Sequence, residues 1–150
     1  MKHFAINETT PSKQAFKIAL AQAVASAVNS GAAEVLLLVP AKGNLGPSII
    51  EDVLGRQCVS KLKNGESIRV SRELTTTVRA RTARTLELAA RSKVVLAAFF
   101  PPDDLQLLLK RFDPDTEVIY LGWLDAELDE WKNLHNPELI EVPPPVSGDA

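Results

Sequence analysis

The residues that decide the fold are Val35-Leu36-Leu37-Leu38-Val39-Pro40, followed by the loop Ala41-Lys42-Gly43-Asn44-Leu45-Gly46-Pro47-Ser48. The first part is a run of branched apolar residues that is too short for a helix and ends at a proline. Such a run predicts a strand buried on both faces, as in a parallel sheet. The second part is a glycine-broken turn that opens a helix, because proline suits the first helical turn.

The rest of the chain repeats this alternation of strand and helix. Thr10 and Pro11 are expected to begin a first helix, which Gly31 ends. Helices are also predicted from Pro47, near Thr82, after the two prolines at 101–102 and from Asp125. Apolar or alternating runs predict further strands at 67–71, 75–79, 93–99, 117–121 and 139–142.

Strands that alternate with helices predict a parallel sheet covered on both faces. We therefore expect a three-layer α/β/α sandwich with a mostly parallel sheet of four or five strands, in flavodoxin-like or Rossmann-like order. The crossovers should be right-handed. Leu37, Leu96 and Ile119 should be almost fully buried in adjacent strands.

Two local alternatives stay open between residues 47 and 79. The helix from Pro47 contains Gly55, which weakens that prediction by about 1 kcal/mol relative to alanine. Its end at Asn64-Gly65 is equally a hairpin-turn sequence. Residues 67–71 alternate polar and apolar side chains and are expected at a sheet edge, where 75–79 could pair back as a short hairpin.

Length and composition indicate one domain. A chain of 150 residues with 45% hydrophobic content can bury an adequate core. We place the domain at residues 1–142 and expect a disordered tail at 143–150. The single cysteine, Cys58, excludes an internal disulfide, and no apolar run has the length of a signal peptide or a membrane span. We expect a cytoplasmic protein that does not bind membranes.

Charge is unevenly distributed along the chain. The net charge is −2, yet residues 56–93 carry 10 basic and 3 acidic side chains, a net of +7. Residues 94–150 carry 3 basic and 12 acidic side chains, a net of −9. The asymmetry predicts a basic and an acidic surface, unless the two segments fold side by side and neutralise each other.

The loop after the first buried strand is a candidate anion site. In open parallel sheets, ligands lie beyond the carboxyl ends of the strands. The loop offers glycines, a lysine and a helix start, as phosphate-binding loops do, although it spells neither a Walker A motif nor Gly-x-Gly-x-x-Gly. The alternative is an ordinary connection in which the glycines supply special backbone angles. The candidate ligand-binding residues here are Lys42, Gly43, Asn44, Gly46 and Ser48.

An arginine- and threonine-rich segment adds three candidate ligand-binding residues, Arg72, Arg79 and Arg81. Arginine forks and threonine hydroxyls suit a phosphate or a nucleic-acid backbone. No aromatic residue lies between Arg56 and Lys93, so this segment offers no base stacking. The alternatives are a solvated face and ion pairs with acidic residues. We expect at least one of Arg79, Arg81 and Arg84 to pair with a carboxylate of residues 103–130, within the chain or across a dimer.

Other chemistry-bearing residues give weaker signals. Asp103 and Asp104 could hold Mg²⁺ beside a phosphate, but a helix start favours carboxylates without any ligand. Cys58 falls on an apolar helical face and is expected in the core. His3 and His135 are too few and too far apart in sequence to predict a metal or catalytic site. We therefore assign no catalytic residue, no metal and no cofactor.

Three functions follow from these patterns. The first is a binding or regulatory domain that takes a phosphate-bearing small molecule at the carboxyl ends of the strands, with nucleic acid as a less supported ligand. The second is a protein–protein adaptor or a domain that pairs with a second copy of itself. The third is an enzyme acting on a phosphorylated or nucleotide substrate, with Asp103, Asp104 or Asp125 as acid, base or metal ligand.

Overall fold

The computed structural model describes residues 1–8, 12–46, 48–86 and 91–143. Within these residues, strands form one sheet in the order β3-β4-β2-β5-β6-β1-β7, and all neighbours are parallel except the β3–β4 pair. The strands are β1 (Lys2–Ile6), β2 (Glu34–Val39), β3 (Ile68–Arg69), β4 (Thr77–Thr82), β5 (Val94–Ala98), β6 (Glu117–Leu121) and β7 (Glu138–Ile140).

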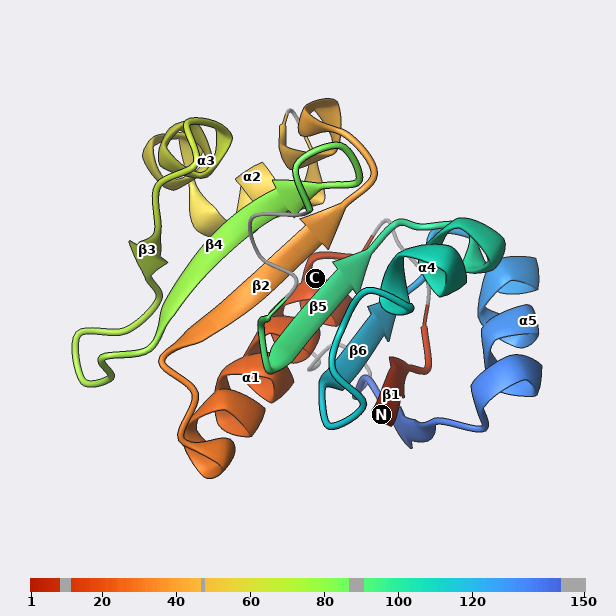
Figure 1. Ribbon diagram of the computed structural model, residues 1–150. Coiled ribbons are helices and arrows are strands. Elements are labelled where there is room, and N and C mark those ends of the chain that lie inside the picture. The colour runs from red at the N-terminus through yellow and green to blue at the C-terminus, as the bar shows by residue number, and fades with distance from the viewer. Residues whose placement is uncertain (9–11, 47, 87–90, 144–150) are drawn as a thin grey trace.

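Helices cover both faces of the sheet (Figure 1). One face carries α1 with η1, α2 and α3, and the other carries α4 and α5. The helices are α1 (Lys13–Ser30), the 3₁₀ turn η1 (Lys42–Leu45), α2 (Ile49–Leu54), α3 (Arg56–Lys63), α4 (Pro102–Leu109) and α5 (Asp125–His135). The predicted three-layer α/β/α architecture is therefore confirmed.

The middle of the sheet is the core of the molecule. Leu37, Leu96 and Ile119 face each other across β2, β5 and β6, and all three are 0% exposed. This confirms the prediction made from the three apolar runs. The parallel order places the carboxyl ends of these strands at one edge, as the arrowheads in Figure 1 show, and the site described below lies at that edge.

The sheet is larger than the four or five strands expected. It has seven strands among the described residues, and the one that no sequence pattern predicted is β1, which lies between β6 and β7 and pairs in parallel with both. Its sequence, Lys2-His3-Phe4-Ala5-Ile6, has only three apolar residues in a row, and these are buried because β1 sits inside the sheet. The edge position of residues 67–71 and their hairpin with 75–79 are confirmed as β3 and β4, although β4 continues to Thr82 alongside β2.

The helix expected from Pro47 is broken in two. Gly55 adopts φ of 90°, which favours glycine, and separates α2 from α3. Ser48 caps α2, since its side chain accepts a hydrogen bond from the Ile50 amide. Asn64 and Gly65 end α3 and do not form a hairpin turn.

The remaining helix ends agree with the sequence in part. Ser12 caps α1 by accepting from the Ala15 amide, and Gly31 ends it with φ of 73° as expected. The start expected at Thr10 and Pro11 lies outside the described residues, as do Pro47, Ala89, Ala90 and the tail beyond Pro143. Leu86 is buried, whereas Leu134 of α5 is 45% exposed.

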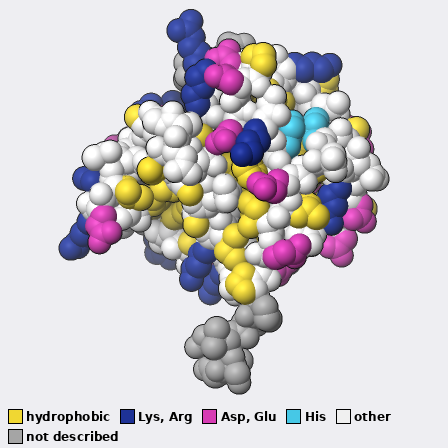
Figure 2. All heavy atoms as spheres, turned by 90° about the horizontal axis from the view of Figure 1, so that it is seen from below, with side chains coloured by type: hydrophobic (Ala, Val, Ile, Leu, Met, Phe, Trp, Pro, Cys, Tyr) yellow, Lys and Arg dark blue, Asp and Glu magenta, His cyan; other side chains and the backbone are white. Residues whose placement is uncertain are grey.

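Two histidines stack at the amino end of β1. The His3 and His135 rings are 4.2 Å apart at their centroids, and His135 also contacts buried Trp131 at 4.1 Å. Figure 2 shows the two histidine side chains side by side on the surface seen from below. Burial, the neighbouring His135 and the N-terminal amine lower the pKa of His3 to about 4, and burial lowers the pKa of His135.

This stack predicts a pH-dependent loss of stability. Because the folded-state pKa of His3 lies below its ordinary value of about 6.5, the unfolded chain binds more protons between those two values. The free energy of unfolding should therefore be highest above pH 6.5 and fall as the pH drops toward 4. Thermal unfolding at pH 7.0, 5.5 and 4.5 measures the fall. A His3→Asn variant should show a shallower one, and identical pH profiles for variant and parent would exclude this cause.

The expected neutralisation of the two charged segments occurs at one place only among the described residues. Lys93 contacts Asp113 and Asp115, each at 3.1 Å, and these contacts raise the pKa of Lys93 and lower that of Asp115. Within the chain the expected arginine pair does not form: Arg79 pairs with Glu34 of β2, at 3.3 Å. Among the described side chains, neither Arg81 nor Arg84 makes an ion pair with the acidic segment.

Candidate functional site: a basic cleft beside the free edge of β4

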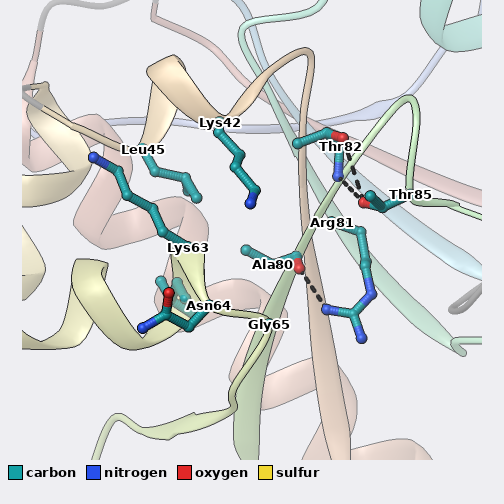
Figure 3. A pocket seen from close by; sticks show the side chains of 10 residues that line it. Lys42, Leu45, Lys63, Asn64, Gly65, Ala80, Arg81, Thr82 and Thr85 are labelled. Carbon is teal, nitrogen blue, oxygen red and sulfur yellow. Dashed lines mark hydrogen bonds between the residues drawn. The ribbon is translucent and has the colours of Figure 1, made fainter.

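A cleft of about 530 Å³ opens where β2 and β4 end. This volume is within the range of roughly 300–1,000 Å³ typical of small-molecule sites. Apolar side chains line it together with basic, hydroxyl and amide side chains (Figure 3). The lining residues are Lys42, Leu45, Leu62, Lys63, Asn64, Gly65, Ala80, Arg81, Thr82 and Thr85.

The free edge of β4 forms one wall. Strand β3 pairs only with Thr77 and Val78, so the rest of β4 has no strand beyond it among the described residues. The Thr77 amide donates to the Ala33 carbonyl, on the β2 side. Backbone groups alternate between the two sides of a strand. The amides and carbonyls of Ala80 and Thr82 are therefore directed outward, to the cleft.

The chain satisfies part of this edge with its own side chains. Arg81 Nη1 donates to the Ala80 carbonyl at 2.8 Å, and the Thr82 amide donates to Thr85 Oγ1 at 2.9 Å. The two threonine hydroxyl oxygens are 3.3 Å apart. These contacts block the edge against another strand and leave the Ala80 amide facing the cleft.

Three cations surround the cleft. Figure 3 shows Lys42 extending from η1 toward Ala80, and the Arg81 side chain lying along β4 opposite it. Lys63 comes from the last turn of α3, and its Nζ turns toward the Gly46 carbonyl, 3.5 Å away. No carboxylate is among the described residues that line the cleft.

The Arg81 guanidinium is only partly compensated. Its Nε atom is buried and has no hydrogen-bond partner among the described residues. Burial lowers the pKa of Arg81, the neighbouring charge of Arg79 lowers it further, and Glu34 acts in the opposite direction. A bound anion would supply negative charge beside this guanidinium and acceptors for its accessible N–H groups.

The structure brings together only two of the eight residues predicted for the site, Lys42 and Arg81. Asn44 lines a different hollow, and its Oδ1 accepts from the Ala41 amide at 2.9 Å. Ser48 caps α2, and Arg79 is held by Glu34. The others lie outside the cleft lining as well: Gly43, Gly46 and Arg72.

The loop glycines do not supply special backbone angles. Positive φ among the described glycines occurs at Gly31, Gly55 and Gly65. Gly46 is buried, and a side chain there would meet the Glu51 carboxylate. Its role is close packing against α2.

Sequence reasoning missed the α3 end and the hydroxyls. Asn64 and Gly65 were interpreted as a helix end or a hairpin turn, and Lys63 was counted only within the basic segment. Thr82 and Thr85 belong to the arginine- and threonine-rich segment but were not selected as site residues. Their positions in the sequence could have pointed to these residues, because both the α3 end and the two threonines lie next to strands at the predicted sheet edge.

The other chemistry-bearing residues of the sequence do not line the cleft. Asp103 and Asp104 are exposed in the first turn of α4 and do not line the cleft. Among the described residues, no three His, Cys, Asp or Glu side chains are placed to hold a metal ion. No helix within the described ranges is long and apolar enough to cross a membrane. Cys58 is half-buried and packs against the core, as expected.

A further hollow of about 570 Å³ lies between α1 and the β3–β4 loop. Its lining is mostly apolar and includes Val28, which is 49% exposed.

Comparison of the chain with models of known protein families and with curated proteins finds no match. The fold and the cleft thus define an α/β domain with a basic, ligand-sized cleft at the carboxyl ends of its strands.

Proposed function

We propose that the chain is a binding or regulatory domain that takes a small phosphate-bearing ligand in the cleft beside β4. The observation that carries this proposal is the charge of the lining. Lys42, Lys63 and Arg81 enclose a space of about 530 Å³ to which no described carboxylate contributes. Like charges gathered around one cleft repel each other, and a bound anion relieves that repulsion.

The donors suit phosphate in kind as well as in charge. A phosphate presents several acceptor oxygens and binds best to charge-assisted donors. Here the donors are the guanidinium of Arg81, the ammonium of Lys42 and the outward amide of Ala80. Thr85 adds a hydroxyl, and Leu45 and Leu62 provide an apolar surface for the rest of the ligand.

Calorimetric titration with inorganic phosphate, pyrophosphate and a short oligonucleotide tests the proposal. We expect saturable binding of pyrophosphate that is tighter than that of phosphate and weakens moderately between 50 and 200 mM salt, because the Debye length shortens over this range. Sulfate at equal ionic strength separates specific binding from general screening. An absence of binding at millimolar pyrophosphate would refute the proposal.

The oligonucleotide distinguishes a cleft from a nucleic-acid surface. If it binds while pyrophosphate does not, with a steep logarithmic salt dependence, the basic segment acts as a surface for polyanions. In that case the small-ligand proposal is wrong.

A further inference from the structure

A second, smaller crevice also borders η1, through Asn44. It has a volume of about 220 Å³ and is lined by Asn44, Phe99, Trp123, Leu124 and Glu127. Strand β2 leads into η1 and α2 on one face, whereas the neighbouring β5 leads into α4 on the other (Figure 1). The connections therefore diverge here, and such points in open α/β sheets are where ligands bind.

The crevice has an aromatic wall that folding alone does not favour. Trp123 is 45% exposed and Leu124 is 55% exposed. Phe99 meets Trp123 edge to face, with ring centroids 5.2 Å apart. Phe99 also has φ of 69°, an outlier for a bulky residue, and its amide is held by the Leu121 carbonyl at 2.9 Å. Strained backbone of this kind concentrates at binding sites.

A polar pair completes the crevice. The Ala41 amide donates to Asn44 Oδ1 at 2.9 Å, which fixes the orientation of the Asn44 side chain and leaves Nδ2 as a donor. The Leu124 amide donates to Glu127 Oε1 at 3.2 Å, which leaves Oε2 as an acceptor. One lining therefore combines an aromatic face, an amide donor and a carboxylate acceptor.

We infer that this crevice takes a flat heteroaromatic ring that carries both donors and acceptors, which is the chemistry of a nucleobase. Its volume is below the range of whole small-molecule ligands, roughly 300–1,000 Å³, and suits one ring system. The inference extends the proposed function, because η1 borders both hollows through Lys42 and Asn44. A ligand with a phosphate in the cleft and a ring in the crevice belongs to the nucleotide class.

The ring site is tested with nucleosides, which carry no phosphate. Adenosine, guanosine, cytidine and uridine are titrated while tryptophan fluorescence is followed. Trp123 is accessible whereas Trp131 is fully buried, so a saturable change is expected from Trp123 for at least one nucleoside. Trp123→Leu should weaken that binding by about tenfold or more, because stacking contributes on this scale. Leu107→Ala, at an exposed apolar residue of α4, is the matched control and should leave binding unchanged.

Two conservative variants test the polar pair without removing the local caps. Asn44→Asp keeps the acceptor for the Ala41 amide and removes the donor, and Glu127→Gln keeps an acceptor for the Leu124 amide and removes the charge. Each should change which nucleoside binds best. Equal affinities for all four nucleosides in the parent and both variants would overturn the polar-pair assignment.

The proposed phosphate site and the proposed ring site can be refuted separately. Pyrophosphate binding without any nucleoside binding, and with no gain for the matching mononucleotide, overturns the ring site and leaves the proposed function standing. Nucleoside binding without pyrophosphate binding refutes the proposed function and supports the ring site. If Trp123→Leu instead changes a monomer–dimer equilibrium and no nucleoside binds, the crevice is a protein contact and the inference is wrong.

Discussion

Replacing Leu37 by alanine should lower the free energy of unfolding by about 2–5 kcal/mol, the range for a buried leucine that leaves a cavity. Leu37 is fully buried in β2, between Ala80 of β4 and Leu96 of β5. Its side chain belongs to the core on the α1 face of the sheet. Because strands lie close to β2 on both sides, the surrounding residues can move only little to fill the space left by a missing side chain. Because small domains are stable by only about 5–15 kcal/mol, this is a large share.

Urea unfolding followed by circular dichroism measures this effect. The midpoint should fall while the slope with denaturant stays constant, since the surface exposed on unfolding is unchanged. Leu107→Ala removes a leucine that is 63% exposed and should change the free energy of unfolding by no more than about 0.5 kcal/mol. Equal losses for the two variants would contradict the central position of β2.

The double substitution of Lys42→Gln with Arg81→Gln should abolish measurable pyrophosphate binding. Hydrogen bonds to charged groups contribute about 1.5–3 kcal/mol each, so each single variant should lose roughly ten- to a hundredfold in affinity. Lys63→Gln should lose less, because its Nζ turns toward the Gly46 carbonyl. Calorimetric titration of the four variants gives these values directly.

Arg79→Gln is the matched control for the arginine. It removes the same charge from the same strand, but Arg79 pairs with Glu34 and does not line the cleft. Its effect on affinity should be small and should disappear with added salt, because exposed charges at a distance are screened. If Arg79→Gln weakens binding as much as Arg81→Gln, general charge and not the cleft would explain the affinity.

The sequence predicts the centre of this fold better than its edges. Strands β2, β5 and β6 are apolar runs that can only be buried, so their position follows from composition. Strand β1 escapes detection because its burial comes from pairing with β6 and β7, which are more than a hundred residues away. The break between α2 and α3 requires φ of 90° at Gly55, which the glycine permits but does not dictate.

The sequence anticipates only part of the cleft lining. Parallel strands end at one rim, and Lys42, after β2, and Arg81, near the end of β4, line the same cleft there. Side-chain direction is decided by contacts that the pattern does not contain. Glu34 draws Arg79 away, and Asn44 bonds to the Ala41 amide. Lys63 enters from the end of α3 only because α3 packs beside β4.

The anion site is tested most directly by mapping pyrophosphate onto the chain with ¹H–¹⁵N NMR. If the cleft binds pyrophosphate, saturable shifts should gather at the amides of Gly65 and Ala80 and at the Arg81 side-chain Nε–H. The backbone amide signal of Lys93 should not shift, because the side-chain ammonium of this residue is already held by Asp113 and Asp115. Shifts spread over the basic surface without saturation, or an unmoved Arg81 signal, would contradict a ligand site beside β4.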